Sequence, residues 1–256
     1  MYLVAVKTLS LRCPIRNVVV VEDGTLADED RQVLRRHIPG CELVGLSTPD
    51  TGRCPKGGTW ERLALISKLA RTQYVIQLDS DNIVCGKIPE VVAAYLGNRS
   101  FTLGTDSGRH IVSAAEASAE ACRTDSQHVQ ILAERLLDKI DRAGTTRYVR
   151  GCSGFAGFAR GFCFWELAES LSEKMGAYMG SKWNEWGSEQ VGSNFVIANS
   201  PGSVVLPYPR YASFHPRLDW RKSDLLHFMG TYRFRRGIYR RAAAEAIRRL
   251  SHGAGL

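Results

Sequence analysis

Two aspartates, Asp79 and Asp81, stand one residue apart where a short apolar run ends, in the segment QYVIQLDSDNIV of residues 73–84. Like charges this close repel each other, and a hard divalent cation ligated by carboxylate oxygens relieves the repulsion. Mg²⁺ or Mn²⁺ suits such an oxygen-rich site and keeps coordination positions open for a diphosphate. The alternative is a turn that the two acids form with Ser80 and Asn82. Their position directly after an apolar run favours the metal site.

The element that must position these acids is the run itself. Tyr74, Val75, Ile76 and Leu78 form a short apolar run, rich in β-branched and aromatic residues and too short for a helix, so they predict a buried strand. In an open α/β sheet, the carboxyl end of a strand lies at the rim where ligands bind. Strand patterns at residues 17–22 and 42–46 enclose a helical pattern at residues 27–37, which is typical of a βαβ unit. The sequence therefore predicts an α/β fold with a mostly parallel central sheet flanked by helices.

Residues 1–12 fit either a strand or an amphipathic helix. A strand there would leave some ten residues before the strand of residues 17–22, fewer than a parallel crossover usually needs, so a helix is favoured. Further helices are expected over residues 60–70, 88–96 and 125–143, with Thr124 and Asp125 offering an N-cap for the last of these. Further strands are expected over residues 100–104 and 203–206.

Two segments carry residues suited to a sugar. The segment RYVRGCSGFAGFARG of residues 147–161 alternates glycines, including Gly154, with aromatic residues. It predicts either the floor of a sugar pocket or a bulged core strand, and the two interpretations stay open. In residues 182–194, KWNEWGSEQVGSN, two tryptophans, Trp183 and Trp186, are candidates to stack on a sugar ring.

The same stretch holds Glu189 and Gln190, which are candidates to bind hydroxyls or abstract a proton. The structural alternative is that they open a helix whose apolar face packs inward. Arg62, on the helix expected over residues 60–70, is a candidate to point at the acid pair.

His227 ends another apolar run, LLHFMG at residues 225–230, and a lone histidine there is more often a core residue than a ligand. In company with two acids it becomes a candidate ligand. The Asp-Ser-Asp at Asp79 and the His-Phe-Met-Gly that ends at Gly230 together resemble the DxD and HxxG pair of GT-A fold glycosyltransferases. The resemblance is closest to the family eight group of glycogenin-like and lipopolysaccharide galactosyltransferase-like enzymes, and it spans residues 17–230.

This resemblance implies a GT-A, Rossmann-like fold for residues 1–230 and Mn²⁺, or Mg²⁺, bound by Asp79, Asp81 and His227. It implies transfer of a hexose from a nucleoside diphosphate sugar to a hydroxyl of a saccharide or lipid-linked acceptor, in bacterial-type surface saccharide or glycan synthesis. The catalytic position falls on Glu189 and Gln190, and the sequence leaves retention or inversion of the anomeric configuration open. Donor contacts fall on Arg62, Asp79, Ser80, Asp81, Gly154, Trp186, Gly230 and Arg233.

The chain departs from the family at its start. GT-A domains open with a strand whose following loop holds the nucleotide base, whereas the strand at residues 17–22 corresponds to the family's second. The fold is therefore expected to lack the first nucleotide-binding strand, and the identity of the base is not indicated.

Charge is concentrated at the other end. The 256-residue chain has a net charge of +8, of which residues 231–256 carry +6 from seven arginines and one glutamate. These residues predict a basic helical tail that either rests on an anionic membrane or is a solvated surface helix. The nearly neutral body carries no nucleic-acid-binding motif, so no nucleic-acid partner is expected.

Seven scattered cysteines and the lack of a signal-peptide pattern predict a cytoplasmic protein, with the inner face of the membrane as the site of any peripheral contact. Two other functions compete. The segment DSDNI resembles the nucleophile motif of haloacid dehalogenase-like phosphohydrolases, with Asp79 as the nucleophile. A non-catalytic sugar-binding relative is the third possibility.

Overall fold

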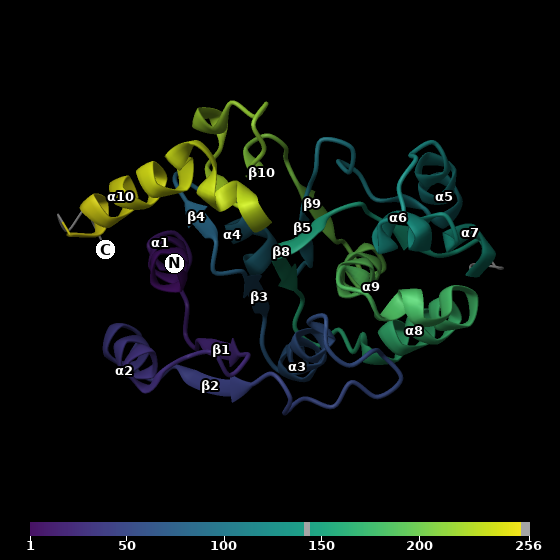
Figure 1. The fold of residues 1–256 in the computed structure, drawn as a ribbon, viewed down its shortest axis with the longest axis horizontal. Helices are drawn as coiled ribbons and strands as arrows, with labels where there is room; N and C mark the ends of the chain where they lie inside the picture. The colour runs from purple at the N-terminus through teal and green to yellow at the C-terminus, as the bar shows by residue number, and fades with distance from the viewer. Residues whose placement is uncertain (141–143, 252–256) are drawn as a thin grey trace.

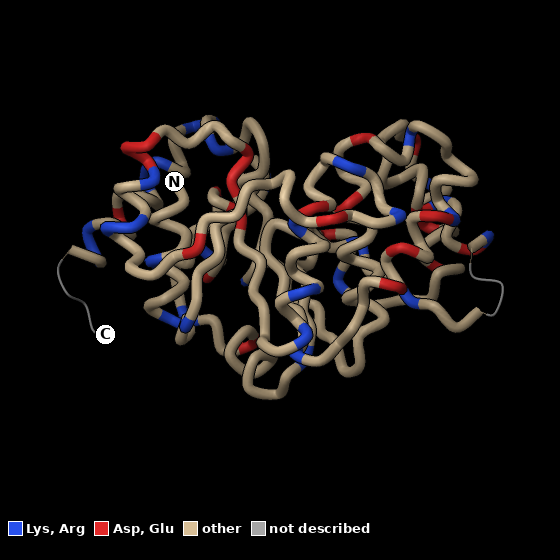
Figure 2. The backbone as a smooth tube through the Cα atoms, turned by 90° about the horizontal axis from the view of Figure 1, so that it is seen from below, with Lys and Arg blue, Asp and Glu red and all other residues tan. Residues whose placement is uncertain are grey.

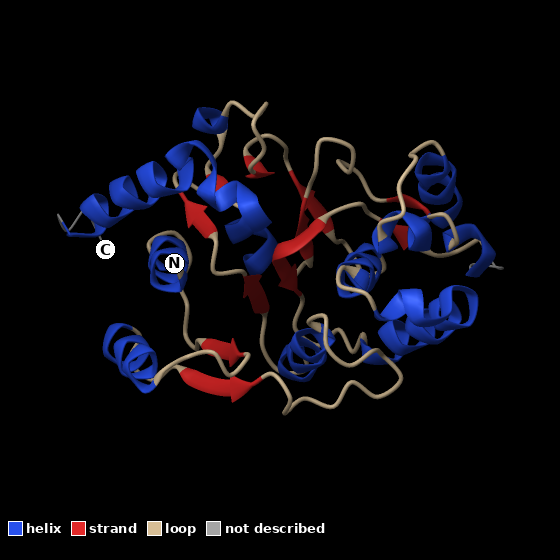
Figure 3. Ribbon diagram, in the orientation of Figure 1, coloured by secondary structure: helices blue, strands red, loops and turns tan. Residues whose placement is uncertain are grey.

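The computed structural model describes residues 1–140 and 144–251 as a mixed α/β fold, with helices on both sides of the strands (Figures 1 and 3). Its four-stranded central sheet has the order β3 (Val75–Leu78), β8 (Cys152–Phe158), β5 (Phe101–Leu103) and β9 (Val204–Leu206). The α/β class is thus confirmed. The central sheet, however, is mixed rather than mostly parallel, because β8 runs antiparallel to both of its neighbours and only β5 and β9 are parallel.

The predicted βαβ unit is present. Strands β1 (Val19–Glu22) and β2 (Glu42–Gly45) pair in parallel and are joined by α2 (Asp28–His37). The helix favoured over residues 1–12 is confirmed as α1 (Tyr2–Ser10). In the part of the chain that the structure describes, β1 and β2 form a sheet of their own, separate from the central sheet.

A second small sheet joins distant parts of the sequence. Strand β11 (Leu225–His227) pairs antiparallel with β4 (Asn82–Val84) and parallel with β10 (Tyr211–Ser213). The register places His227 opposite Asn82, one residue from Asp81. This pairing explains how a histidine from late in the chain reaches the acids.

The other elements surround these sheets. They are α3 (Trp60–Ala70), α4 (Pro89–Leu96), β6 (Val112–Ser113), α5 (Ala114–Cys122), α6 (Val129–Glu134), α7 (Leu137–Ile140), β7 (Arg147–Tyr148), α8 (Trp165–Met179), η1 (Gly180–Asn184), α9 (Ser188–Ala198), η2 (Trp220–Lys222), η3 (Gly230–Gly237) and α10 (Ile238–Ser251). No helix of the described residues is both long and apolar enough to cross a membrane.

The single long helix expected over residues 125–143 is wrong. A turn separates α6 from α7, and the backbone N–H of Leu136 there donates to the carbonyl of Ala133, three residues back. The N-cap is His128, whose ring accepts a bond from the N–H of Gln130. Residues 141–143, the expected end of that helix, lie outside the described residues.

The basic tail expected over residues 231–256 forms η3 and α10 as far as Ser251, at one end of the molecule (Figure 2). Residues 252–256 lie outside the described residues. Helix α10 buries Ala242, Ala243 and Ala246 in an apolar cluster with Ile83 and Phe228. The tail is therefore packed on the body through one face, while most of its arginines are exposed.

Candidate functional site

The turn between β3 and β4 carries the two acids and is fixed to the central sheet. The backbone N–H of Asp79 donates to the carbonyl of Gly154 at 2.9 Å. The side-chain amide of Asn82 donates to the carbonyls of both Asp79 and Gly154, at 3.0 and 2.9 Å. Asn82 thus supplies side-chain bonds that close the turn, and the acids face the end of a cavity.

His227 meets both acids, as the sequence predicts. Its Nε2 lies 3.2 Å from Oδ1 of Asp81 and 3.8 Å from Oδ2 of Asp79. One ligand atom from each of the three residues lies within 4.8 Å of the others. Gly154 makes room for the ring, because a Cβ at that position would overlap with the imidazole of His227.

The three side chains fit a divalent cation. Metal–oxygen bonds of about 2.1 Å in octahedral geometry place neighbouring ligand atoms about 3 Å apart. The distances from Nε2 of His227 to the two carboxylates are close to that spacing. Two carboxylates and one imidazole are a donor set that accepts Mn²⁺ or Mg²⁺.

The other ring nitrogen of His227, Nδ1, has two partners that were not predicted from the sequence. Nδ1 of His227 lies 3.3 Å from Sγ of Cys152 and 3.4 Å from Oγ of Ser213. Burial disfavours the imidazolium, but the negative charge of the Cys152 thiolate and the bond to Asp81 together raise the pKa of His227 well above 6.5. No motif marks these partners, although Cys152 lies in the glycine-rich segment that the sequence singles out.

Asp81 is the more enclosed of the two acids, with a side chain 8% exposed. Burial alone would raise its pKa, but the hydrogen bond and charge of His227, followed by Arg233, lower it below its ordinary value. Nη2 of Arg233, on η3, lies 3.6 Å from Oδ2 of Asp81. Arg233, predicted as a donor contact, therefore lies beside one acid of the pair.

Arg62 connects Asp79 with Glu189. Its Nη1 lies 2.6 Å from Oδ1 of Asp79, and its Nη2 lies 3.5 Å from Oε2 of Glu189. The same oxygen of Glu189 accepts bonds from the hydroxyls of Thr59 and Ser153, at 3.0 and 3.4 Å. The expectation that Arg62 points at the acids is confirmed by this geometry.

Glu189 is 2% exposed, and its other oxygen, Oε1, has no hydrogen-bond partner among the described residues. Burial raises the pKa of Glu189, although the charge of Arg62 opposes that rise. A buried carboxylate with one free oxygen, one guanidinium away from the acid pair, is chemically suited to take up a proton.

Gln190 faces away from the acids. Its Nε2 donates to Oε1 of Gln130 on α6 at 2.8 Å, and its Oε1 accepts from the N–H of Ser153 at 3.4 Å. Trp183 is 2% exposed and donates to Oγ of Ser172, so the interpretation that it stacks on a sugar is wrong. It belongs to the core because its ring packs edge-on against Trp60.

The remaining candidates lie on the surface. Trp186 is 75% exposed. Ser80 is exposed at the turn between the acids and lines the cavity with them. Gly230 is exposed and has a φ of +52°, a left-handed conformation that glycine adopts without strain, at the start of η3.

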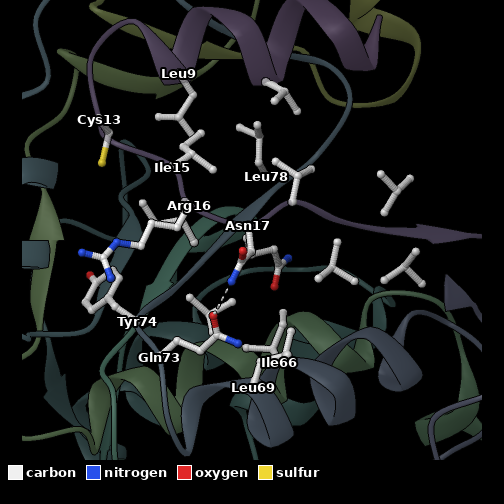
Figure 4. Close-up of a pocket in the computed structure, with 18 of the residues that line it drawn as sticks. Leu9, Cys13, Ile15, Arg16, Asn17, Ile66, Leu69, Gln73, Tyr74 and Leu78 are labelled. Atoms are coloured by element: carbon white, nitrogen blue, oxygen red, sulfur yellow. Dashed lines mark hydrogen bonds between the residues drawn. The ribbon is translucent and has the colours of Figure 1, made fainter. Parts of the chain in front are cut away.

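A cavity of about 1010 Å³ begins at this site. Arg62, Asp79, Ser80, Asp81 and Arg233 line one end of it. From there it follows the length of β3, with β1 on its other side; Figure 4 shows the part around Gln73 and Asn17.

The chain was compared with known proteins. It is similar to the crystal structure of mouse xyloside xylosyltransferase 1 in its apo form, with a TM-score of 0.46 and 11% sequence identity over 90% of this chain and 92% of that one. No model of a known protein family matches the sequence. No curated protein matches it either.

Proposed function

We propose that this protein is a metal-dependent glycosyltransferase that moves a hexose from a nucleoside diphosphate sugar to an acceptor hydroxyl. The observation that carries the proposal is the convergence of Asp79, Asp81 and His227 at the end of β3. The sequence motifs that resemble the DxD and HxxG pair supply these same residues. The cluster opens onto a cavity large enough for a ligand of that size.

Asp79, Asp81 and His227 are the residues that would hold Mn²⁺ or Mg²⁺. When bound, such a cation neutralises charge that builds on the departing diphosphate. Arg62 and Arg233 place two guanidinium groups against the acids, the first at Asp79 and the second at Asp81. In our proposal they bind the phosphate oxygens and stabilise the same charge electrostatically.

Glu189 is the residue that we propose for proton transfer at the acceptor. Its Oε1 without a hydrogen-bond partner among the described residues, and its pKa raised by burial, suit a group that takes up a proton. If Glu189 acts as a general base on the acceptor hydroxyl, the anomeric configuration inverts. If the leaving phosphate takes that proton, Glu189 positions the sugar and the configuration is retained.

We place the acceptor on the side of η3. Phe234 is 78% exposed and lies between Arg233 and Arg235, in a tail most of whose arginines are exposed. An exposed aromatic among cations is suited to the surface of an anionic membrane. A lipid-linked saccharide is therefore the acceptor class that we propose, with the protein at the inner face of the membrane.

The first test removes one carboxylate. Wild-type protein is expected to show a thermal shift with nucleoside diphosphates in the presence of Mn²⁺, because a ligand that binds only the folded state raises the melting temperature. Asp81→Ala is expected to lose that shift, whereas Asp125→Ala, at an exposed position, keeps it. The measurement is a panel of nucleoside diphosphates with and without Mn²⁺.

Two results would overturn the proposal. One is an undiminished metal-dependent shift in Asp81→Ala. The other is release of inorganic phosphate from a phosphomonoester without any nucleotide sugar, which would favour a phosphohydrolase with Asp79 as its nucleophile.

A further inference from the structure

Two strand edges face each other across the cavity without pairing. Among the described residues, β1 pairs only with β2, and β3 ends its sheet with β8 as its one neighbour. Just before these strands, Nδ2 of Asn17 donates to Oε1 of Gln73 at 3.4 Å (Figure 4). The two strands therefore begin side by side, yet no ladder joins them.

The hydrogen bonds of β1 show which of its backbone groups face the cavity. The carbonyls of Val18 and Glu22 accept bonds from β2 and its following residue. In a parallel ladder, alternate residues turn both their N–H and their C=O to the same neighbour. The N–H and C=O groups of Val19 and Val21 therefore point away from β2, toward the cavity that both residues line.

The same reasoning applies to β3. Directly after β3, the N–H of Asp79 donates to the carbonyl of Gly154 in β8. In an antiparallel ladder every second residue is hydrogen-bonded across the pair, so Val75 and Gln77 also face β8. Ile76 and Leu78 turn their backbone groups to the open side, where they line the cavity.

The other walls of the cavity are apolar. Val6 and Leu9 of α1 cover one face, and Leu65, Ile66 and Leu69 of α3 cover the opposite face. The space thus has polar backbone edges on two sides and apolar side chains above and below. A strand that is buried on both faces needs these surroundings.

We propose that the part of this cavity between β1 and β3, beyond the end that the acid pair lines, is a binding slot for one extended, apolar segment of a partner polypeptide, about four to six residues long. The bound segment pairs with β1 along one edge and with β3 along the other. It places Val, Ile or Leu side chains against α1 and α3, and it joins the β1–β2 pair to the central sheet. This proposal does not depend on the glycosyltransferase assignment.

A lipid chain is a poorer occupant, because it would leave the backbone N–H and C=O groups of both edges unpaired in an apolar space. A second copy of this chain is also disfavoured. In the described residues every strand is already paired in a sheet, and the exposed large hydrophobic residues are spread over separate elements. A second copy therefore presents no free apolar strand to insert.

The test uses full-length protein and a synthetic peptide with about six Val and Ile residues flanked by lysines. Residue-resolved amide hydrogen exchange is measured with and without the peptide. In free protein, the amides of Ile76 and Leu78 are expected to exchange faster than those of Val75 and Gln77. The peptide is expected to slow exchange at Ile76, Leu78, Val19 and Val21 by about tenfold or more.

Two matched controls sharpen the result. A peptide with the same side chains but a methylated backbone cannot donate to either edge, and it is expected not to bind. Leu65→Arg places a charged side chain in the slot and is expected to abolish peptide binding, whereas Val33→Arg, at an exposed position on α2, leaves it intact.

The proposal is overturned if the methylated peptide binds equally well, since that would indicate a general apolar ligand. It is also overturned if the open-edge amides remain unprotected up to the solubility limit of the peptide. Both results come from the wild-type protein and so do not require Leu65→Arg to fold.

Discussion

At the scale of single residues, His227 is held from both sides of its ring. Nε2 faces the two acids, and Nδ1 faces Cys152 and Ser213. A partner at the second ring nitrogen fixes which nitrogen is available to a metal. Cys152 is thus a positioning residue for the proposed site.

Replacing that thiol should weaken metal binding. Cys152→Ala is expected to lower Mn²⁺ affinity about tenfold, because the imidazole loses a partner that orients it. Cys152→Ser keeps a polar group near Nδ1 and is expected to recover most of the affinity. Mn²⁺ titration by calorimetry measures the effect, with Cys122→Ala, at an exposed cysteine, as the control. Equal affinity in Cys152→Ala would show that the contact does not orient the ring.

The pH dependence of metal binding follows from the raised pKa of His227. A metal ion at Nε2 must displace a proton, so Mn²⁺ affinity should rise with pH by up to about tenfold per unit below the folded-state pKa. For the stability of the metal-free protein we expect the opposite trend. Its stabilisation from this proton is complete below pH 6.5, the ordinary pKa, and is lost as the pH rises through the raised value.

Mn²⁺ titrations and denaturant midpoints across this pH range check both trends, with His227→Gln as the reference that cannot take up the proton. A pH-independent affinity in the wild-type protein would contradict the assignment of His227 as a ligand.

Replacing Gly154 tests whether the imidazole of His227 needs the space that a glycine leaves. Gly154→Ala puts a Cβ into the imidazole of His227 and is expected to cost about 1–3 kcal/mol of unfolding free energy. Gly176→Ala is a matched control, since a Cβ there meets nothing within 4 Å. In helix α8 that control should stabilise the protein by about 0.5–1 kcal/mol. Urea midpoints of the two variants give the comparison.

At the scale of elements, α10 is more than a solvated appendage. Ala243 and Ala246 are buried against the sheet of β4 and β11, whereas Ala244 faces solvent. Ala243→Asp buries a charge without a partner and is expected to cost about 2 kcal/mol or more of unfolding free energy. Ala244→Asp should change it by less than about 0.5 kcal/mol. Similar denaturant midpoints for the two variants would show that α10 does not pack as described.

Elements with a clear local pattern were predictable from the sequence. The alternation of strand and helix identified β1, α2 and β2, and the helix from Trp60 to Ala70 was expected with those bounds. The break between α6 and α7 was not predictable from periodicity. Arg135 lies at this break and donates to the carbonyls of Ala121 and Thr124, a contact with another element that the apolar pattern does not record.

The candidate metal cluster was predictable because the sequence motifs and the strand pairing bring the same residues together. The two acids follow one apolar run, and the histidine ends another. The pairing of β4 with β11 alone is enough to bring them together. The direction of β8 was not predictable, since strand pairing is decided by contacts far apart in sequence. For the same reason Cys152 became a partner of His227 only in the folded chain.

At the scale of the whole molecule, two sheets and the tail each contribute residues to the proposed site. The central sheet supplies β3 and β8, the small sheet supplies His227, and the tail supplies Arg233 (Figure 1). Strands β1 and β3 are separated by the cavity, and no strand of the described residues lies between them. Most of the net charge of the chain lies in the tail. The body that holds the acids is therefore nearly neutral and produces only a weak net electrostatic field.

The guanidinium of Arg62 is shared by Asp79 and Glu189 and so links the two parts of the proposed site. Burial and the charge of Asp79 both raise the pKa of Glu189, while the charge of Arg62 lowers it. A cation that neutralised Asp79 would remove one of the two effects that raise this pKa. In the function that we propose, cation binding and the ionisation of Glu189 are thereby coupled, and the pKa of Glu189 would be lower in the loaded protein than in the empty one.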